Sequence, residues 1–354
     1  MRSLLLAGTA LALIASPAYA FNAGLILQVG NNNTTGNSYQ QNPPGGLVSQ
    51  ASGANSGVII SGGDNNFNQI QQKAARWSIN DAQQIQVGNG NVAQTNQETT
   101  QGSGAGGYFT FGKACPELWC PPLVIPHSFD IHNNDAWTVQ VGNNNYSYTY
   151  QYGGGGPGNN SGVLQVGWAN GSIVFQVGGN SQQTLQFGFL NGSVTGQFGY
   201  GNESDTFQLG MLNGQITLQG GIGNEANTTQ VGVLNGSATA QFGRFNESDT
   251  VQVGVLNGSS TYQNGRRNDA TTTQVGLLNA SDTDQVGNDN SASTTQLGAF
   301  NKAGTAQVGD NNSSTIFQAG TGNDTQVAQS DDSNWAVVGQ VGNNNKASIT
   351  QSNW

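Results

Sequence analysis

Polar positions along most of the chain alternate with variable ones, at the two-residue period of a β-strand. Alternation places Ser237, Thr239 and Gln241 on one face of a single strand. Between copies of this segment these positions hardly change, whereas a neighbouring position on the other face varies from Val194 to Asp249. An interior tolerates little change in volume or charge. We therefore predict that Gln, Thr and Ser or Ala point inward, although Val and Phe would be the usual core residues.

The same pattern recurs with a fixed period of eleven residues. Each unit reads Q-x-G-x-x-N-x-S/A-x-T-x, and several columns holding phase over many units are the signature of a stacked repeat. The Gln column comprises Gln186, Gln197, Gln208, Gln219, Gln230, Gln241, Gln252, Gln263, Gln274, Gln285, Gln296, Gln307, Gln318, Gln329, Gln340 and Gln351. The Asn column begins with Asn191, Asn202, Asn213, Asn224, Asn235, Asn246, Asn257, Asn268 and Asn279.

Two unlike units alternate, so the structural period is 22 residues. One kind carries a Leu-Asn-Gly turn, as at Leu234, and the other carries Asn-Glu or Asn-Asp, as at Asn246. The sequence thus predicts an all-β, amyloid-like β-solenoid with parallel stacked rungs, two strands and two tight turns per 22 residues. Buried amides are acceptable in such a stack because identical side chains hydrogen-bond from rung to rung, about 4.7–4.8 Å apart. Gly and Asn of the motif are expected to adopt the positive φ of the turns.

The repeat resembles the curlin repeat of bacterial curli fibres. The segment from Gln230 through Gly232 and Asn235 to Gln241 matches the order of Gln, Gly, Asn, Ala and Gln in that motif. The likeness is clean from Gln186 onward and looser upstream. It implies a strand–turn–strand unit and a secreted subunit of extracellular amyloid fibres.

The upstream part of the chain is less regular. Ile60 with Gly62, Asn65 and Gln71 keeps the motif spacing, with Ile in place of Gln. The step from Gln176 to Gln186 is ten residues, and a Gly-rich insert at 153–158 lengthens another step; both are expected at turns, where length changes are absorbed readily. We divide the chain into a signal peptide (1–20), irregular N-terminal repeats (21–101), a non-repeat insert (102–135) and curlin-like solenoid repeats (136–354).

Composition and charge exclude several classes of protein. Only 8% of the residues are charged and Gly occupies 53 positions, unlike an enzyme with a large aliphatic core. The net charge of −10 disfavours nucleic acid, whose phosphates would repel the surface. Arg2, a short apolar run and the sequence Ala-Tyr-Ala ending at Ala20 are typical of a secretory signal peptide, with cleavage predicted after Ala20. No later apolar stretch is long enough to span a membrane.

The 102–135 insert holds both Cys and both His residues of the chain. Cys115 and Cys120 are interpreted as a disulfide, because the protein is expected to be exported. A metal site of these residues with His127 and His132, or free thiols, are alternatives. Aromatic residues and Pro also gather here, so the insert is either a small packed loop or a binding tip.

No catalytic constellation emerges from the sequence, so we predict no enzyme activity and no cofactor. The resemblance implies a secreted structural protein that polymerises end to end into extracellular curli-like fibres of a biofilm or adhesion matrix. It also implies passage through a bacterial-type periplasm, an outer-membrane secretion channel and a nucleator subunit as partners. Two alternatives remain: a monomeric solenoid adhesin with the 102–135 insert as its binding tip, and an ice-binding solenoid, prompted by the Thr column.

Overall fold

The computed structural model describes residues 22–41, 54–74, 79–100, 134–154 and 158–352. Within these ranges the chain forms β-strands joined by tight turns and no helix. Two compact units are distinguished: unit 1 comprises residues 1–143 with 149–159, and unit 2 comprises residues 144–148 with 160–354. The predicted all-β, parallel β-solenoid is confirmed, with two strands per turn and about 12 turns in all.

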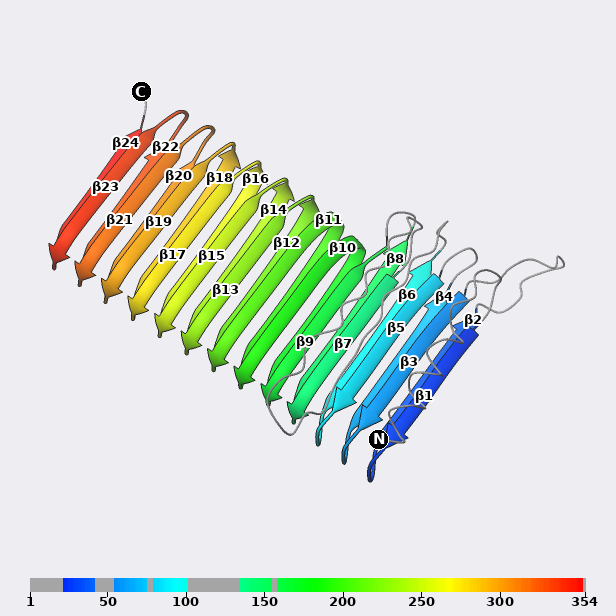
Figure 1. Ribbon diagram of the computed structural model, residues 1–354. Helices are drawn as coiled ribbons and strands as arrows, with labels where there is room; N and C mark the ends of the chain where they lie inside the picture. The colour runs from blue at the N-terminus through cyan, green and yellow to red at the C-terminus, as the bar shows by residue number, and fades with distance from the viewer. Residues whose placement is uncertain (1–21, 42–53, 75–78, 101–133, 155–157, 353–354) are drawn as a thin grey trace. The chain divides into compact units, whose positions relative to one another are not determined.

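In unit 1 each strand pairs in parallel with the strand two places along the chain (Figure 1). Odd-numbered strands make one ladder and even-numbered strands the other. Successive turns differ in length: Asn66 bonds to Asn33, 33 residues earlier, and Asn91 bonds to Asn66, 25 residues earlier. The strands of this part are β1 (Asn22–Val29), β2 (Thr34–Gln41), β3 (Ala54–Gly62), β4 (Phe67–Ala74), β5 (Ile79–Val87), β6 (Val92–Thr100), β7 (Asn134–Asn143) and β8 (Tyr146–Gly154), the last divided between the two units.

Unit 2 is the regular part of the solenoid. Equivalent residues of successive turns pair 22 residues apart, for example Gln230 with Gln252. β10 and β11 each run through a corner and so belong to both ladders. The strands are β9 (Asn160–Trp168), β10 (Gly171–Phe189), β11 (Gly192–Met211), β12 (Gly214–Ile222), β13 (Glu225–Val233), β14 (Gly236–Arg244), β15 (Glu247–Val255), β16 (Gly258–Arg266), β17 (Asp269–Leu277), β18 (Ala280–Asn288), β19 (Ser291–Ala299), β20 (Lys302–Val308), β21 (Ser313–Thr321), β22 (Asp324–Ser330), β23 (Trp335–Asn343) and β24 (Lys346–Ser352).

The interior consists mainly of polar side chains. Ser237, Thr239 and Gln241 are all buried, whereas their neighbours on the other face of the strand are partly or fully exposed. The predicted parity is therefore confirmed. Aliphatic residues replace this pattern locally, as in a cluster around Ile59 and Ile70 in unit 1 and another around Ile316 in unit 2. The Thr column that suggested ice binding lies inside the solenoid, where it cannot contact a surface.

The ten-residue step between Gln176 and Gln186 lies at a corner, as predicted. The register between β10 and β11 shifts between Gly179 and Ser181, beside Gly178 with its φ of +112°. Because the missing residue falls at the corner, both Gln residues keep their places in the interior.

The assignment of Ile60 to the Gln column is wrong by one residue. β3 and β5 pair Ser61 with Gln86, while Ile60 pairs with Ile85 on the other face of the two strands. Ser61 is buried and takes the place of Gln. The same shift by one residue applies downstream: Gly63, Asn66 and Gln72 occupy the motif positions that had been given to Gly62, Asn65 and Gln71. The motif spacing fits equally well whether the unit starts at Ile60 or at Ser61. The burial of the Asn66 and Gln72 amides shows that it starts at Ser61.

Candidate functional site

The Gln columns form two continuous ladders of side-chain hydrogen bonds through unit 2. Gln230 Nε2 donates to Gln252 Oε1 at 2.9 Å, and Gln252 Nε2 donates to Gln274 Oε1 at 2.8 Å. One ladder runs through Gln186, Gln208, Gln230, Gln252, Gln274, Gln296, Gln318 and Gln340. The other runs through Gln197, Gln219, Gln241, Gln263, Gln285, Gln307, Gln329 and Gln351. Every bond points the same way along the solenoid.

Each Gln amide also connects the two ladders of strands. Gln252 Nε2 donates to the backbone oxygen of Gly236 at 2.9 Å, across the interior, and Gln241 Nε2 donates to the oxygen of Glu225 at 2.7 Å. An interior Gln thus uses both N–H groups as donors and its oxygen as an acceptor, which satisfies the amide. Fully hydrogen-bonded Gln side chains stabilise a single register of the stacked turns, because a shift in register would leave buried amides without partners.

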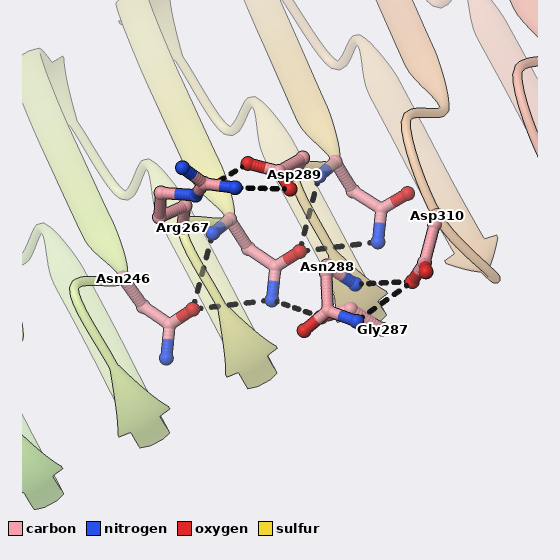
Figure 2. Close-up of polar contacts among 8 residues, drawn as sticks. Asn246, Arg267, Gly287, Asn288, Asp289 and Asp310 are labelled. Atoms are coloured by element: carbon pink, nitrogen blue, oxygen red, sulfur yellow. Dashed lines mark hydrogen bonds and ion pairs between the residues drawn. The ribbon is translucent and has the colours of Figure 1, made fainter.

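The Asn columns close both corners of each turn. Asn268 Nδ2 donates to Asn246 Oδ1 at 3.1 Å and to the backbone oxygen of Gly287 at 2.9 Å, and Asn268 N donates to the same oxygen of Asn246 at 3.1 Å (Figure 2). Asn213, Asn235, Asn257 and Asn279 make the equivalent bonds at the other corner. Each Asn thereby bonds to the turn before it and the turn after it.

The expectation that motif Asn residues adopt positive φ is wrong. The residue before each Asn adopts it instead: φ is +58° at Leu256 and +54° at Arg267. A left-handed backbone costs energy for residues with a Cβ atom. The hydrogen bonds of the following Asn compensate for this cost, since they fix the corner from both sides. The motif Gly does behave as expected, for instance Gly254 at φ +131°, where a Cβ atom would lie 1.9 Å from Gly276 O.

Acidic side chains stack in register on the odd-numbered strands of unit 2. Glu203, Glu225, Glu247 and Asp269 occupy one outward column. Partial burial raises the pKa of Glu247 above its usual value, and the carboxylates of Asp269 and Asp249 raise it further. At the corner between β16 and β17, two residues before Asp269, Arg267 forms an exposed ion pair with Asp289, with 2.7 Å between Nε and Oδ1 (Figure 2).

Two buried carboxyl groups stack in unit 1. Asp81 of β5 pairs in register with Asp135 of β7, and an oxygen of each is buried without a hydrogen-bond partner. Burial raises the pKa of Asp81 to about 7, against which a hydrogen bond from Ser56 acts. Burial also raises the pKa of Asp135 well above its usual value, and the nearby Asp81 adds to the effect. Two such neighbours cannot both ionise without cost.

Several predicted features lie outside the described residues, namely the signal peptide, Cys115, Cys120 and both His residues. Within the described ranges, no three His, Cys, Asp or Glu side chains lie close enough to hold a metal ion. The same residues include no helix of sufficient length and hydropathy to cross a membrane. Asp249, Asp282 and Asp284 occupy outward positions.

The crosslinks between Gln amides and the opposite backbone had no signal in the sequence beyond the invariant Gln column itself. The column predicted stacking along the solenoid, but a second N–H donor on every amide required a second acceptor. Counting donors would have pointed to a backbone oxygen across the interior.

The segments that contain these columns of Gln, Gly and Asn match a known family of sequence repeats. The curlin-associated repeat family matches residues 265–298, 287–320 and 320–352. Residues 265–352 of the chain thus carry curlin repeats. The hydrogen-bonded columns of the matched curlin repeats continue without a break toward the N-terminus as far as Gln186. Comparison of the chain with curated proteins gives no match. Curlin repeats on a β-solenoid indicate a curli-like structural protein rather than an enzyme.

Proposed function

We propose that the protein is secreted and polymerises end to end into extracellular, curli-like fibres of a biofilm or adhesion matrix. The observation that carries this proposal is the pair of Gln ladders, in which every amide donates to an identical amide one turn further on. Because donor and acceptor are the same group, a second copy of the chain can continue the ladder. The strand backbones of a terminal turn offer the matching N–H and C=O groups.

The described end of unit 2 is suited to such addition. β24 pairs with β22, and β23 pairs with β21; neither has a second partner strand among the described residues. Gln351 still donates to the oxygen of Trp335, as the interior Gln residues do to the opposite strand. The last described turn therefore has the conformation of an interior turn, as end-to-end stacking of copies requires.

Secretion through an outer-membrane channel and a nucleator subunit are part of the proposal and follow from the curlin likeness. The predicted signal peptide and the net charge of −10, which favours solubility during export, support them.

The test is negative-stain microscopy of the freshly purified chain lacking residues 1–20, followed over hours together with thioflavin-T fluorescence. We expect unbranched fibres whose growth parallels the rise in fluorescence. Seeds of preformed fibre should shorten the lag, because they supply the terminal template. A folded, β-rich monomer that persists at the same concentration and does not respond to seeds would refute polymerisation and favour the monomeric adhesin.

A further inference from the structure

One outer face of unit 2 is apolar over several consecutive turns. Three adjacent columns carry large apolar residues. Two lie on the odd-numbered strands and run from Phe187 to Leu297 and from Trp168 to Leu277. The third lies at the corner that follows these strands, where the residues from Leu190 to Phe300 have positive φ. We call these three columns, from β9 to β19, the apolar face. Most of these side chains are solvent-exposed, and Val253 and Leu256 have exposed fractions of 37% and 42%.

The opposite face of the same turns differs. Its equivalent columns are interrupted by Gly220 and Asn264, and they carry Arg244 and Arg266 where the apolar face has Met211 and Val233. Stabilisation of the solenoid by stacked side chains would operate equally on both faces. The opposite face also exposes large apolar residues, such as Phe198, Ile216 and Phe245, but its columns are broken by Gly, Asn and Arg. Three unbroken apolar columns on one face alone therefore require another reason, and monomeric soluble proteins rarely leave such a patch uncovered.

We infer that the apolar face is a lateral interface with a second copy of the solenoid. The partner must be flat and must repeat at the same rung spacing for the columns to interdigitate over many turns, and a second copy meets both conditions. Seven rungs at about 4.8 Å and a width of five residues at about 3.3 Å give roughly 550–600 Å² per copy. Two copies would bury roughly 1,100–1,200 Å², which lies at the lower end of the range for a stable, specific interface.

Charge determines how the two copies are oriented. The stacked carboxylates of Glu203, Glu225, Glu247 and Asp269 lie at the other end of the same strands, about 20 Å from the Val253 column. A two-fold axis parallel to the solenoid axis and centred on the apolar face lays apolar columns on apolar columns and leaves the carboxylates on opposite outer sides. A two-fold axis along the strands would bring the same carboxylates face to face. The paired solenoids are therefore parallel.

This pairing goes beyond polymerisation and does not require it. The perturbing variant of the full chain combines V231T, V253T and V275T with L234N and L256N. Thr is β-branched and suits strands, and Asn tolerates the left-handed corner, so the fold should be retained. The control places three changes of the same kinds on the opposite face: V194T, I216T and F245N, where Phe245 also has positive φ.

The measurements are mass per length by electron microscopy and cross-section by small-angle X-ray scattering, with circular dichroism to verify the fold. We expect wild type and the control to be paired, and the perturbing variant to have half their mass per length. Unpaired wild type, or a folded variant as wide as wild type, would overturn the inference. Wild type that remains single and binds phosphatidylcholine vesicles would also overturn it, in favour of a lipid surface.

A second variant keeps the test valid if the first misfolds. L234K with L256K changes only the corner, and the equivalent corner of the opposite edge already carries Arg267 at positive φ. It should abolish pairing and leave strand content unchanged. Polymerisation is measured separately by thioflavin-T kinetics. Chains that pair but never elongate would refute the proposed fibre function alone, and fibres of single width would refute the pairing alone.

Discussion

Replacing one interior amide tests whether the Gln ladders stabilise the solenoid. Gln252→Leu keeps the side chain close in size but removes the donors to Gln274 Oε1 and Gly236 O and the acceptor for Gln230 Nε2. A buried polar group left unsatisfied costs about 1–3 kcal/mol, and two or three are affected here. Burial of the Leu side chain offsets about 1–2 kcal/mol. The net loss of local stability should be about 3 kcal/mol.

The assay is native-state hydrogen exchange with peptide resolution. Each 1.4 kcal/mol changes the opening equilibrium tenfold, so amides of β13, β15 and β17 should exchange about a hundredfold faster in the variant. Turns far from residue 252 should change little, because stacked repeats contact only their neighbours. The control is Gln183→Leu, at an exposed position in β10, which should leave exchange unaltered.

Two results would refute this reasoning. Unchanged protection around residue 252 would mean that the amide bonds are replaced at no cost. A uniform loss of protection over all of unit 2 would mean that the turns unfold together, and that the stability of each turn does not depend on its nearest neighbours alone.

Three further predictions follow from single positions. Gly254→Ala should destabilise unit 2 by more than about 3 kcal/mol, because its Cβ would overlap a backbone oxygen of the next turn, whereas Gly258→Ala, with open space around it, should be neutral or slightly stabilising in thermal melts. The raised pKa values of Asp81 and Asp135 mean that folded unit 1 binds more protons than the unfolded chain between about pH 4 and 7. Stability of unit 1 should therefore be highest below about pH 4 and fall as pH rises toward 7; D81N with D135N should flatten that slope in denaturant titrations. Arg267→Ala should change stability by less than about 1 kcal/mol, since its ion pair is exposed, and a larger effect would contradict the assignment.

The sequence predicted the solenoid because its columns repeat strictly and their variability separates inside from outside. Ser237, Thr239 and Gln241 were assigned to the interior from this contrast alone. The positive φ of Leu256 could not be foreseen, because propensity favours Gly or Asn there and only the bonds of Asn257 reverse it. The shift at Ile60 arose where the period is irregular, and the stacked Asp81 and Asp135 escaped notice because 53 residues separate carboxyl groups that share a column.

The amide columns alone leave one ambiguity that the rest of the sequence resolves. Gln and Asn recur every eleven residues, so a copy joining by half a turn would still stack Gln on Gln and Asn on Asn. The corner residues recur only every 22: Leu256 follows Leu234, whereas Arg267 follows Phe245. A half-turn join would turn the apolar faces and the carboxylate columns of successive copies toward opposite sides of the fibre. Lateral pairing therefore favours full-turn joins, because only these leave the apolar faces of successive copies on one side of the fibre. The two kinds of contact reinforce each other: end-to-end stacking supplies the rung spacing, and the apolar face selects the phase in which rungs are added.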